Sequence, residues 1–182
     1  MDIKKEIEDI LTSTKREGMA NLLAYMESSG FYTAPASTKY HGAEKGALAV
    51  HSLNVYYAAM DLARAWCGED WLNLFKDSIA IVALLHDLGK AGQFGKPLYI
   101  ESDTQPYKYN KSLWTLPHEI VSVVEASKHI KLTEVEQRAI AWHNGLYGVF
   151  KDEIKGNETP LYMVIHFADM WASRVMETVE KE

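Results

Sequence analysis

The stretch Leu84-Leu-His-Asp-Leu-Gly-Lys90 ends a long apolar segment that begins at Trp71. A helix that is apolar nearly all round belongs at the centre of a protein. Within this stretch an imidazole and a carboxylate, those of His86 and Asp87, stand side by side. Such groups are costly to remove from water unless they are hydrogen-bonded, paired or bound to a metal. The stretch therefore predicts a central helix whose end carries chemistry.

The segments on both sides of this helix also show helical spacing. Apolar residues recur at intervals of three and four through residues 1–30, which predicts two helices broken near Gly18. A loop that contains Pro and Gly follows over residues 31–46. The other helices are expected over residues 47–66, 71–88, 118–128, 133–143 and 160–179.

Residues 96–110 differ from the rest of the chain. Two short β-prone pieces, 97–100 and 107–109, flank a polar turn and predict a small β-hairpin. The fold class is therefore all-α, a helical bundle with a small β-hairpin insert. We divide the chain into an N-terminal helical appendage, residues 1–30, and a main domain, residues 31–182.

Composition and charge limit the classes of function. The chain has 182 residues, of which 47% are hydrophobic and 24% charged, as in an ordinary globular protein. The net charge of −6 argues against broad capture of a nucleic-acid backbone but leaves room for a local pocket for one phosphate. No apolar stretch is long enough to cross a membrane. A single cysteine, Cys67, and the lack of a signal-peptide pattern favour the cytoplasm.

Two more polar residues stand in apolar helices and extend the His-Asp pair. His51 lies in the middle of one expected helix, and Asp169 lies within the apolar stretch 164–171 of another. Three helices could thus bring His51, His86, Asp87 and Asp169 to one point. Mixed imidazole and carboxylate ligands suit Mn, Fe, Co, Ni or Mg better than a structural zinc site. The alternative is a set of buried, hydrogen-bonded polar residues without a metal.

The pattern His…His-Asp…Asp, formed by these four residues, resembles that of the HD-domain metal-dependent phosphohydrolases. Further segments resemble a subgroup of small bacterial and phage HD hydrolases, akin to the HD portion of bacterial 3′→5′ exoribonucleases. These segments are residues 31–41, 46–55, 107–110, 116–118, 130–133 and 141–143. The resemblance covers roughly residues 31 to 175 and implies an HD-domain helical bundle.

The resemblance also implies two divalent metal ions. His51, His86, Asp87 and Asp169 would bind the first, and His118 and His143 would bind the second, with Asp87 bridging both. A metal-bound hydroxide would then attack phosphorus in a phosphate ester or phosphoanhydride of a nucleotide or small phosphorylated compound. The chain departs from the subgroup directly after His118, where Glu119 stands in place of a Gly-rich segment.

Three further residues are candidates for roles around the metals. Lys90 could contact a substrate phosphate or donate a proton to the leaving oxygen, or it could be a charge that favours the helix end. His41, in the loop, is expected to line the pocket and bind substrate, the alternative being a loop histidine without a chemical role. His166 could support a ligand or pack in the core.

Several other functions remain open. One is a 3′→5′ exonuclease that acts on short oligonucleotides, and another is a nucleotide-binding regulatory module without turnover. A third is an oxygenase with a dinuclear iron centre. The acidic charge favours a small substrate over long nucleic acid. The N-terminal helices could pack against the main domain or mediate an oligomer.

Overall fold

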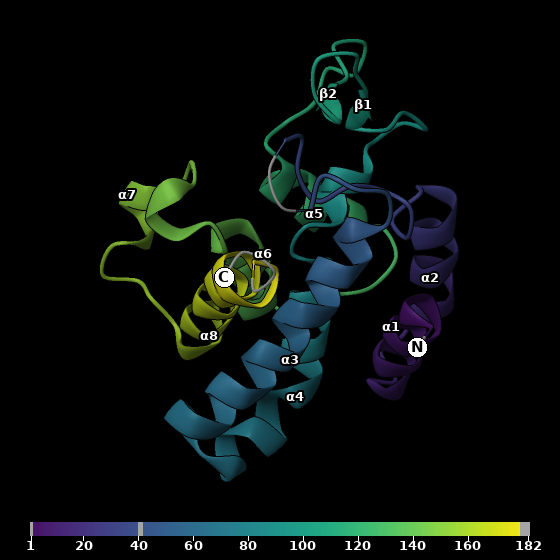
Figure 1. Cartoon of the computed structure of the whole chain (residues 1–182). Helices are drawn as coiled ribbons and strands as arrows, with labels where there is room; N and C mark the ends of the chain where they lie inside the picture. Colours follow the sequence, from purple (N-terminus) through teal and green to yellow (C-terminus); the bar gives the residue numbers. More distant parts are fainter. Residues whose placement is uncertain (1, 40–41, 179–182) are drawn as a thin grey trace.

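The computed structural model of the chain describes residues 2–39 and 42–178. These residues form a mostly helical fold with one two-stranded antiparallel hairpin, which confirms the predicted fold class (Figure 1). The helices are α1 (Ile3–Ser13), α2 (Met19–Ser28), α3 (Ala47–Cys67), α4 (Glu69–Leu85), α5 (His118–Ser127), α6 (Glu134–Trp142), α7 (Lys151–Ile154) and α8 (Pro160–Trp171). No helix in the described part of the chain combines the length and apolar character needed to cross a membrane.

The α3–α4 pair is the centre of the molecule. The two helices lie side by side, with α1 and α2 on one side and α6 and α8 on the other (Figure 1). Residues 79–85 of α4 are fully or almost fully buried, as the apolar sequence of this segment predicts. Because the last two turns of α4 are buried on every side, the residues that follow them, His86 and Asp87, are also held in the interior.

The N-terminal helices share this core. Ile7 and Leu11 of α1 and Leu22 of α2 are fully buried in the same hydrophobic cluster as α4. The guanidinium of Arg16 also donates to the buried carboxylate of Glu136 on α6, at 2.7 and 3.0 Å. These contacts favour packing against the rest of the protein as the role of residues 1–30, and the domain division at residue 30 stays a prediction.

The α-helix that leads into the His-Asp pair ends at Leu85, three residues earlier than the sequence predicts. The side chain of His86 binds the carbonyl of Ala83, to which the amide of Asp87 would donate in a continued helix. Asp87 then leaves the helical conformation, and a 3₁₀ turn follows over Leu88–Ala91. Gly89, the residue after the expected helix end at 88, therefore lies inside this 3₁₀ turn.

The other differences from the expected elements are in the loops and at the C-terminus. A 3₁₀ turn, Gly145–Tyr147, and the short helix α7 were not predicted. The last helix is regular only to Trp171 and continues as a π-helical segment, Ala172–Met176. The expected end of this helix, residue 179, lies outside the described residues.

The predicted β-hairpin is confirmed. Strands β1 (Tyr99–Glu101) and β2 (Tyr107–Tyr109) pair antiparallel, with Tyr99 opposite Tyr109. The amide of Tyr107 donates to the carbonyl of Thr38 at 3.1 Å, so the hairpin is attached to the loop that precedes α3. A capping box formed by Thr133 and Glu136 begins α6.

Candidate metal centre

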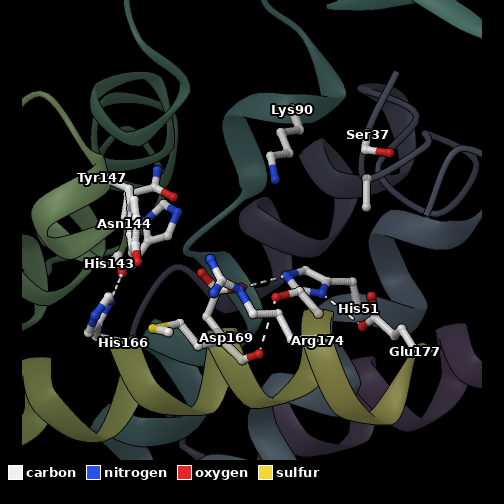
Figure 2. Close-up of a pocket in the computed structure, with 13 residues that line it drawn as sticks. Ser37, His51, Lys90, His143, Asn144, Tyr147, His166, Asp169, Arg174 and Glu177 are labelled. Carbon is white, nitrogen blue, oxygen red and sulfur yellow. Dashed lines mark hydrogen bonds and ion pairs between the residues drawn. The ribbon is translucent and has the colours of Figure 1, made fainter. Parts of the chain in front are cut away.

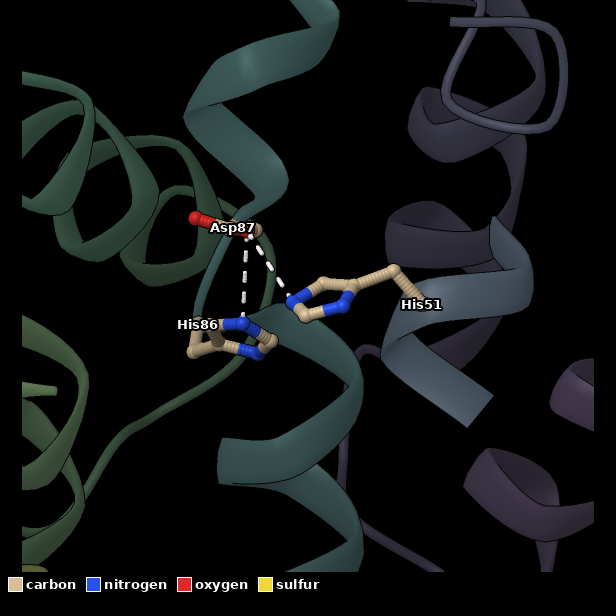
Figure 3. A group of neighbouring side chains, drawn as sticks. All are labelled: His51, His86 and Asp87. Carbon is tan, nitrogen blue, oxygen red and sulfur yellow. Dashed lines mark ion pairs between the residues drawn. The ribbon is translucent and has the colours of Figure 1, made fainter. Parts of the chain in front are cut away.

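The carboxylate of Asp87 is 1% exposed, and its two oxygens face different histidines. Oδ2 lies 3.3 Å from His86 Nε2 and 3.6 Å from His51 Nε2 (Figure 3). Oδ1 lies 3.1 Å from His118 Nε2 and 3.4 Å from His143 Nε2. The carboxylate therefore stands between two pairs of imidazole nitrogens.

Five parts of the fold supply these side chains. His51 comes from the second turn of α3, His118 begins α5, and His143 follows the last residue of α6. From α8, Asp169 Oδ1 reaches within 3.2 Å of His51 Nε2. The structure thus brings together all six residues that the sequence analysis proposes as metal ligands, namely His51, His86, Asp87, His118, His143 and Asp169.

Gly89 allows α5 to come close enough for this arrangement. A Cβ atom at position 89 would lie 2.3 Å from the carbonyl oxygen of His118 and 2.9 Å from the Cβ of Val121. The amide of Gly89 also donates to Ser122 Oγ at 2.9 Å. Because glycine has no side chain, the start of α5 can pack directly against position 89. This close packing brings His118 next to Asp87.

The hydrogen bonds of the histidines turn one nitrogen of each ring toward the centre. The Nδ1 atoms of His86 and His143 lie 2.8 Å from the carbonyls of Ala83 and Ile140. A ring that donates from Nδ1 to a carbonyl presents an Nε2 lone pair on its other side. Here those lone pairs face the oxygens of Asp87, an arrangement that is repulsive unless a cation lies between them.

Two unsatisfied atoms support the same interpretation. Among the described residues, His86 Nε2 and Asp87 Oδ1 are buried without a hydrogen-bond partner of acceptable geometry. Buried polar atoms are rarely left unpaired, and a metal ion is one of the recognised reasons for an exception. Ligand atoms of three overlapping groups lie within 4.8 Å of one another: His51, His86 and Asp87; His86, His143 and Asp169; and Asp87, His118 and His143. The donor set therefore fits divalent metal ions.

The electrostatics of the site favour cations. Burial raises the pKa of Asp87, but Lys90 and the surrounding imidazoles outweigh it and hold the pKa well below its ordinary value. Burial lowers the pKa of His51, but hydrogen bonds to Asp169 and Glu177 outweigh that effect and raise the pKa to about 10. The carboxylates that favour a proton on these rings favour a metal cation for the same reason.

A cavity of about 230 Å³ opens onto this cluster (Figure 2). His51, His143 and Asp169 lie on its wall, and so does Lys90, whose ammonium is 2.6 Å from Asp87 Oδ2. Burial lowers the pKa of Lys90, but the adjacent Asp87 carboxylate has the larger opposite effect. The net pKa is raised, so the side chain stays charged. The ligand centre is thus accessible from one open side.

Of the two other histidine candidates, only His166 has a structural outcome. His166 lines the cavity, and its Nδ1 lies 2.7 Å from the carbonyl of His143, so it contacts a proposed ligand through the main chain. His41, predicted to bind substrate, lies outside the described residues, and its role stays a prediction.

Several residues that the sequence does not single out also lie at the cavity. Arg174, Tyr147, Asn144 and Glu177 line it as well. Asn144 and Tyr147 stand in the unpredicted segment after α6, while Arg174 and Glu177 stand in or directly after the π-helical segment. The departure at Glu119 also has a structural outcome, because its carboxylate lies 3.3 Å from His118 Nδ1. No local sequence pattern distinguishes these residues from ordinary surface positions.

The sequence pattern of the HD domain matches residues 48–169, which is more than half of the chain. The chain belongs to the HD-domain family. The matched range begins in α3, just before His51, and ends at Asp169. HD domains are typically metal-dependent phosphohydrolases. Neither a search of curated proteins nor a search of solved structures found a match, and the predicted subgroup stays a prediction.

Replacing Gly89 with Ala should disturb this HD domain at the contact between the 3₁₀ turn and α5. We expect a loss of about 1–3 kcal/mol in the free energy of unfolding, because the new methyl group overlaps the His118 carbonyl. Metal affinity should also fall, since His118 is pushed from Asp87. Urea unfolding and Mn²⁺ titration of the folded protein measure the two effects.

Gly68→Ala is the matched control. Position 68 has a φ of 83°, but a Cβ there meets no atom within 4 Å. This variant should lose stability through backbone strain alone and keep its metal affinity. Metal binding by Gly89→Ala that equals the wild type would show that the close approach at Gly89 does not position His118.

Proposed function

We propose that this HD domain is a metal-dependent phosphohydrolase that cleaves a phosphate ester or phosphoanhydride of a nucleotide or another small phosphorylated compound. The observation that carries the proposal is the buried carboxylate of Asp87, whose two oxygens face two separate pairs of imidazole nitrogens. A bridging carboxylate between two ligand groups is what a two-metal hydrolytic site requires.

We assign the ligands to two divalent transition metal ions, Mn, Fe, Ni or Co, with Mg as a further candidate. His51, His86, Asp87 and Asp169 would hold one ion, and Asp87, His118 and His143 the other. Bound divalent cations lower the pKa of a coordinated water and offset the charge that develops on phosphoryl oxygens. The protein supplies the spacing through Asp87 and the ring orientation through the Nδ1 hydrogen bonds.

Two cationic side chains suit the cavity to a phosphate group. Lys90 borders the cavity beside Asp87, and the guanidinium of Arg174 lines it 5.5 Å from the ring centre of Tyr147. No carboxylate of the described residues forms an ion pair with Arg174. We assign Arg174 to binding the substrate phosphate, and Lys90 to binding the same phosphate and donating a proton to the leaving oxygen.

The cavity also bears on the rival functions. A space of about 230 Å³ suits a small substrate better than a polynucleotide, in line with the net charge of −6. The complete set of six ligand side chains favours turnover over a purely regulatory module. His41 remains a proposed substrate-binding residue on the loop before α3.

Metal content tests the proposal directly. Protein purified without added metal or chelator should contain about two transition-metal equivalents per chain by inductively coupled plasma mass spectrometry. Asp87→Ala should lose both, because it removes the shared ligand, and should lose Mn²⁺-dependent hydrolysis of nucleotides and p-nitrophenyl phosphate. Asp61→Ala, which changes an 81% exposed carboxylate on α3, is the control and should match the wild type.

Each other result has a defined meaning. One equivalent would remove His118 and His143 from the ligand set. Iron with consumption of oxygen and no hydrolysis would establish the oxygenase alternative. Hydrolysis of short oligonucleotides from the 3′ end would establish the exonuclease. No metal in the purified protein and none taken up from Mn²⁺ would contradict the hydrolase and leave a binding module.

The two cations are tested by substitution to neutral residues. Arg174→Gln should raise KM and Lys90→Gln should lower kcat, each reducing kcat/KM by about 10- to 100-fold, the effect of losing one charge-assisted hydrogen bond. Steady-state kinetics on a phosphate ester that the metal-loaded protein hydrolyses will measure both. Arg138→Gln, which removes a surface guanidinium paired with Glu134 on α6, should leave the kinetics unchanged. Unchanged constants in both test variants would place the phosphate elsewhere.

A further inference from the structure

We propose that Glu177 is a positioning residue for the metal centre, which acts by holding the imidazole of His51 through its Nδ1 atom. Glu177 Oε1 lies 2.9 Å from His51 Nδ1. Figure 2 shows the His51 ring between Glu177 and Asp169. Asp169 approaches the other ring nitrogen of His51, Nε2. The inference rests on the proposed function, because it takes His51 to be a metal ligand.

The contact is held in the interior of the protein. The side chains of His51 and Glu177 are 5% and 13% exposed. The amide of Asn54, one turn after His51 on α3, donates to the same carboxylate oxygen at 3.2 Å. A hydrogen bond between an imidazole and a carboxylate is stronger when it is shielded from water, and a second donor fixes the orientation of the carboxylate.

The partner of His51 differs in kind from those of His86 and His143, whereas His118 Nδ1 also faces a carboxylate, that of Glu119, at 3.3 Å. Nδ1 of His86 and of His143 binds a neutral main-chain carbonyl, whereas Nδ1 of His51 binds a carboxylate. A carboxylate on the far nitrogen keeps the proton on Nδ1, leaves the Nε2 lone pair free, and makes the ring a better donor to a metal. Glu177 therefore strengthens the one ligand that α3 contributes.

The π-helical segment explains how Glu177 reaches this position. Asp169 and Glu177 are eight residues apart, which on a regular α-helix places them roughly 80° apart around the axis. The amide of Glu177 instead donates to the carbonyl of Ala172, five residues earlier, at 3.0 Å. This wider turn takes up one extra residue, so the two carboxylates fall on nearly the same face of the helix and both contact His51.

Two consequences follow for the metal sites. The His51 ring is fixed from both nitrogens by the same C-terminal segment, which thus becomes part of the metal centre. The hydrogen bonds of Glu177 to His51 and Asn54 both lie beside the ligand from α3, so its effect should be confined to the ion that His51 holds.

The test is a Mn²⁺ titration, by isothermal calorimetry, of the full chain after removal of metal with a chelator. Glu177→Gln and Glu177→Ala should bind one of two Mn²⁺ ions about 10- to 100-fold more weakly, with Ala the more affected, and bind the other as the wild type does. The thermal midpoint of metal-free Glu177→Gln should stay close to that of the wild type. Glu153→Gln, which changes an exposed carboxylate on α7, is the control and should bind both ions normally.

The outcomes separate this inference from the proposed function. No Mn²⁺ uptake by the wild type would overturn the proposed function, and the inference with it. Uptake by the wild type with equal affinities in both Glu177 variants would overturn the inference alone. A metal-free Glu177→Gln that is strongly destabilised would also contradict it, because the residue would then serve the fold and not the ligand.

Discussion

The carboxylate of Asp87 is the group on which the rest of the site depends. It is buried at the centre of the protein, where an uncompensated negative charge is costly. Four imidazole nitrogens and the ammonium of Lys90 surround it, and the nitrogens divide between its two oxygens. A carboxylate with this surrounding can stay ionised, and in the proposed function it would hold two cations of the kind that serve hydrolysis of a phosphate ester.

The backbone departs from regular structure at several of the points that position a ligand or its partner. The α-helix that precedes it ends at Leu85, which turns the His-Asp pair toward the centre. Gly89 lets the start of α5 approach, and the π-helical segment after α8 brings Glu177 to His51. Irregular turns of this kind are common at functional sites, because regular helices rarely present all ligands at the required angles.

The sequence predicts the helices and part of the site, for identifiable reasons. Apolar periodicity located the central helices, and buried polar residues within them identified His51, His86, Asp87 and Asp169 as a group. His118 and His143 stand at helix ends, and only the resemblance to HD hydrolases made them candidates. Glu177 and Arg174 were missed because regular helical geometry gives no sign of a π-helical turn, and long-range contacts such as that of Glu177 with His51 leave no local pattern.

The proposal that the Asp87 carboxylate bridges two metal ions is tested most directly by a crystal structure of the Mn²⁺-soaked protein with anomalous diffraction. We predict two anomalous peaks about 3.5–4 Å apart, one on each side of the Asp87 carboxylate. One peak should lie within bonding distance of His51 and Asp169, and the other within bonding distance of His118 and His143. A single peak, or two peaks that do not share Asp87, would contradict it.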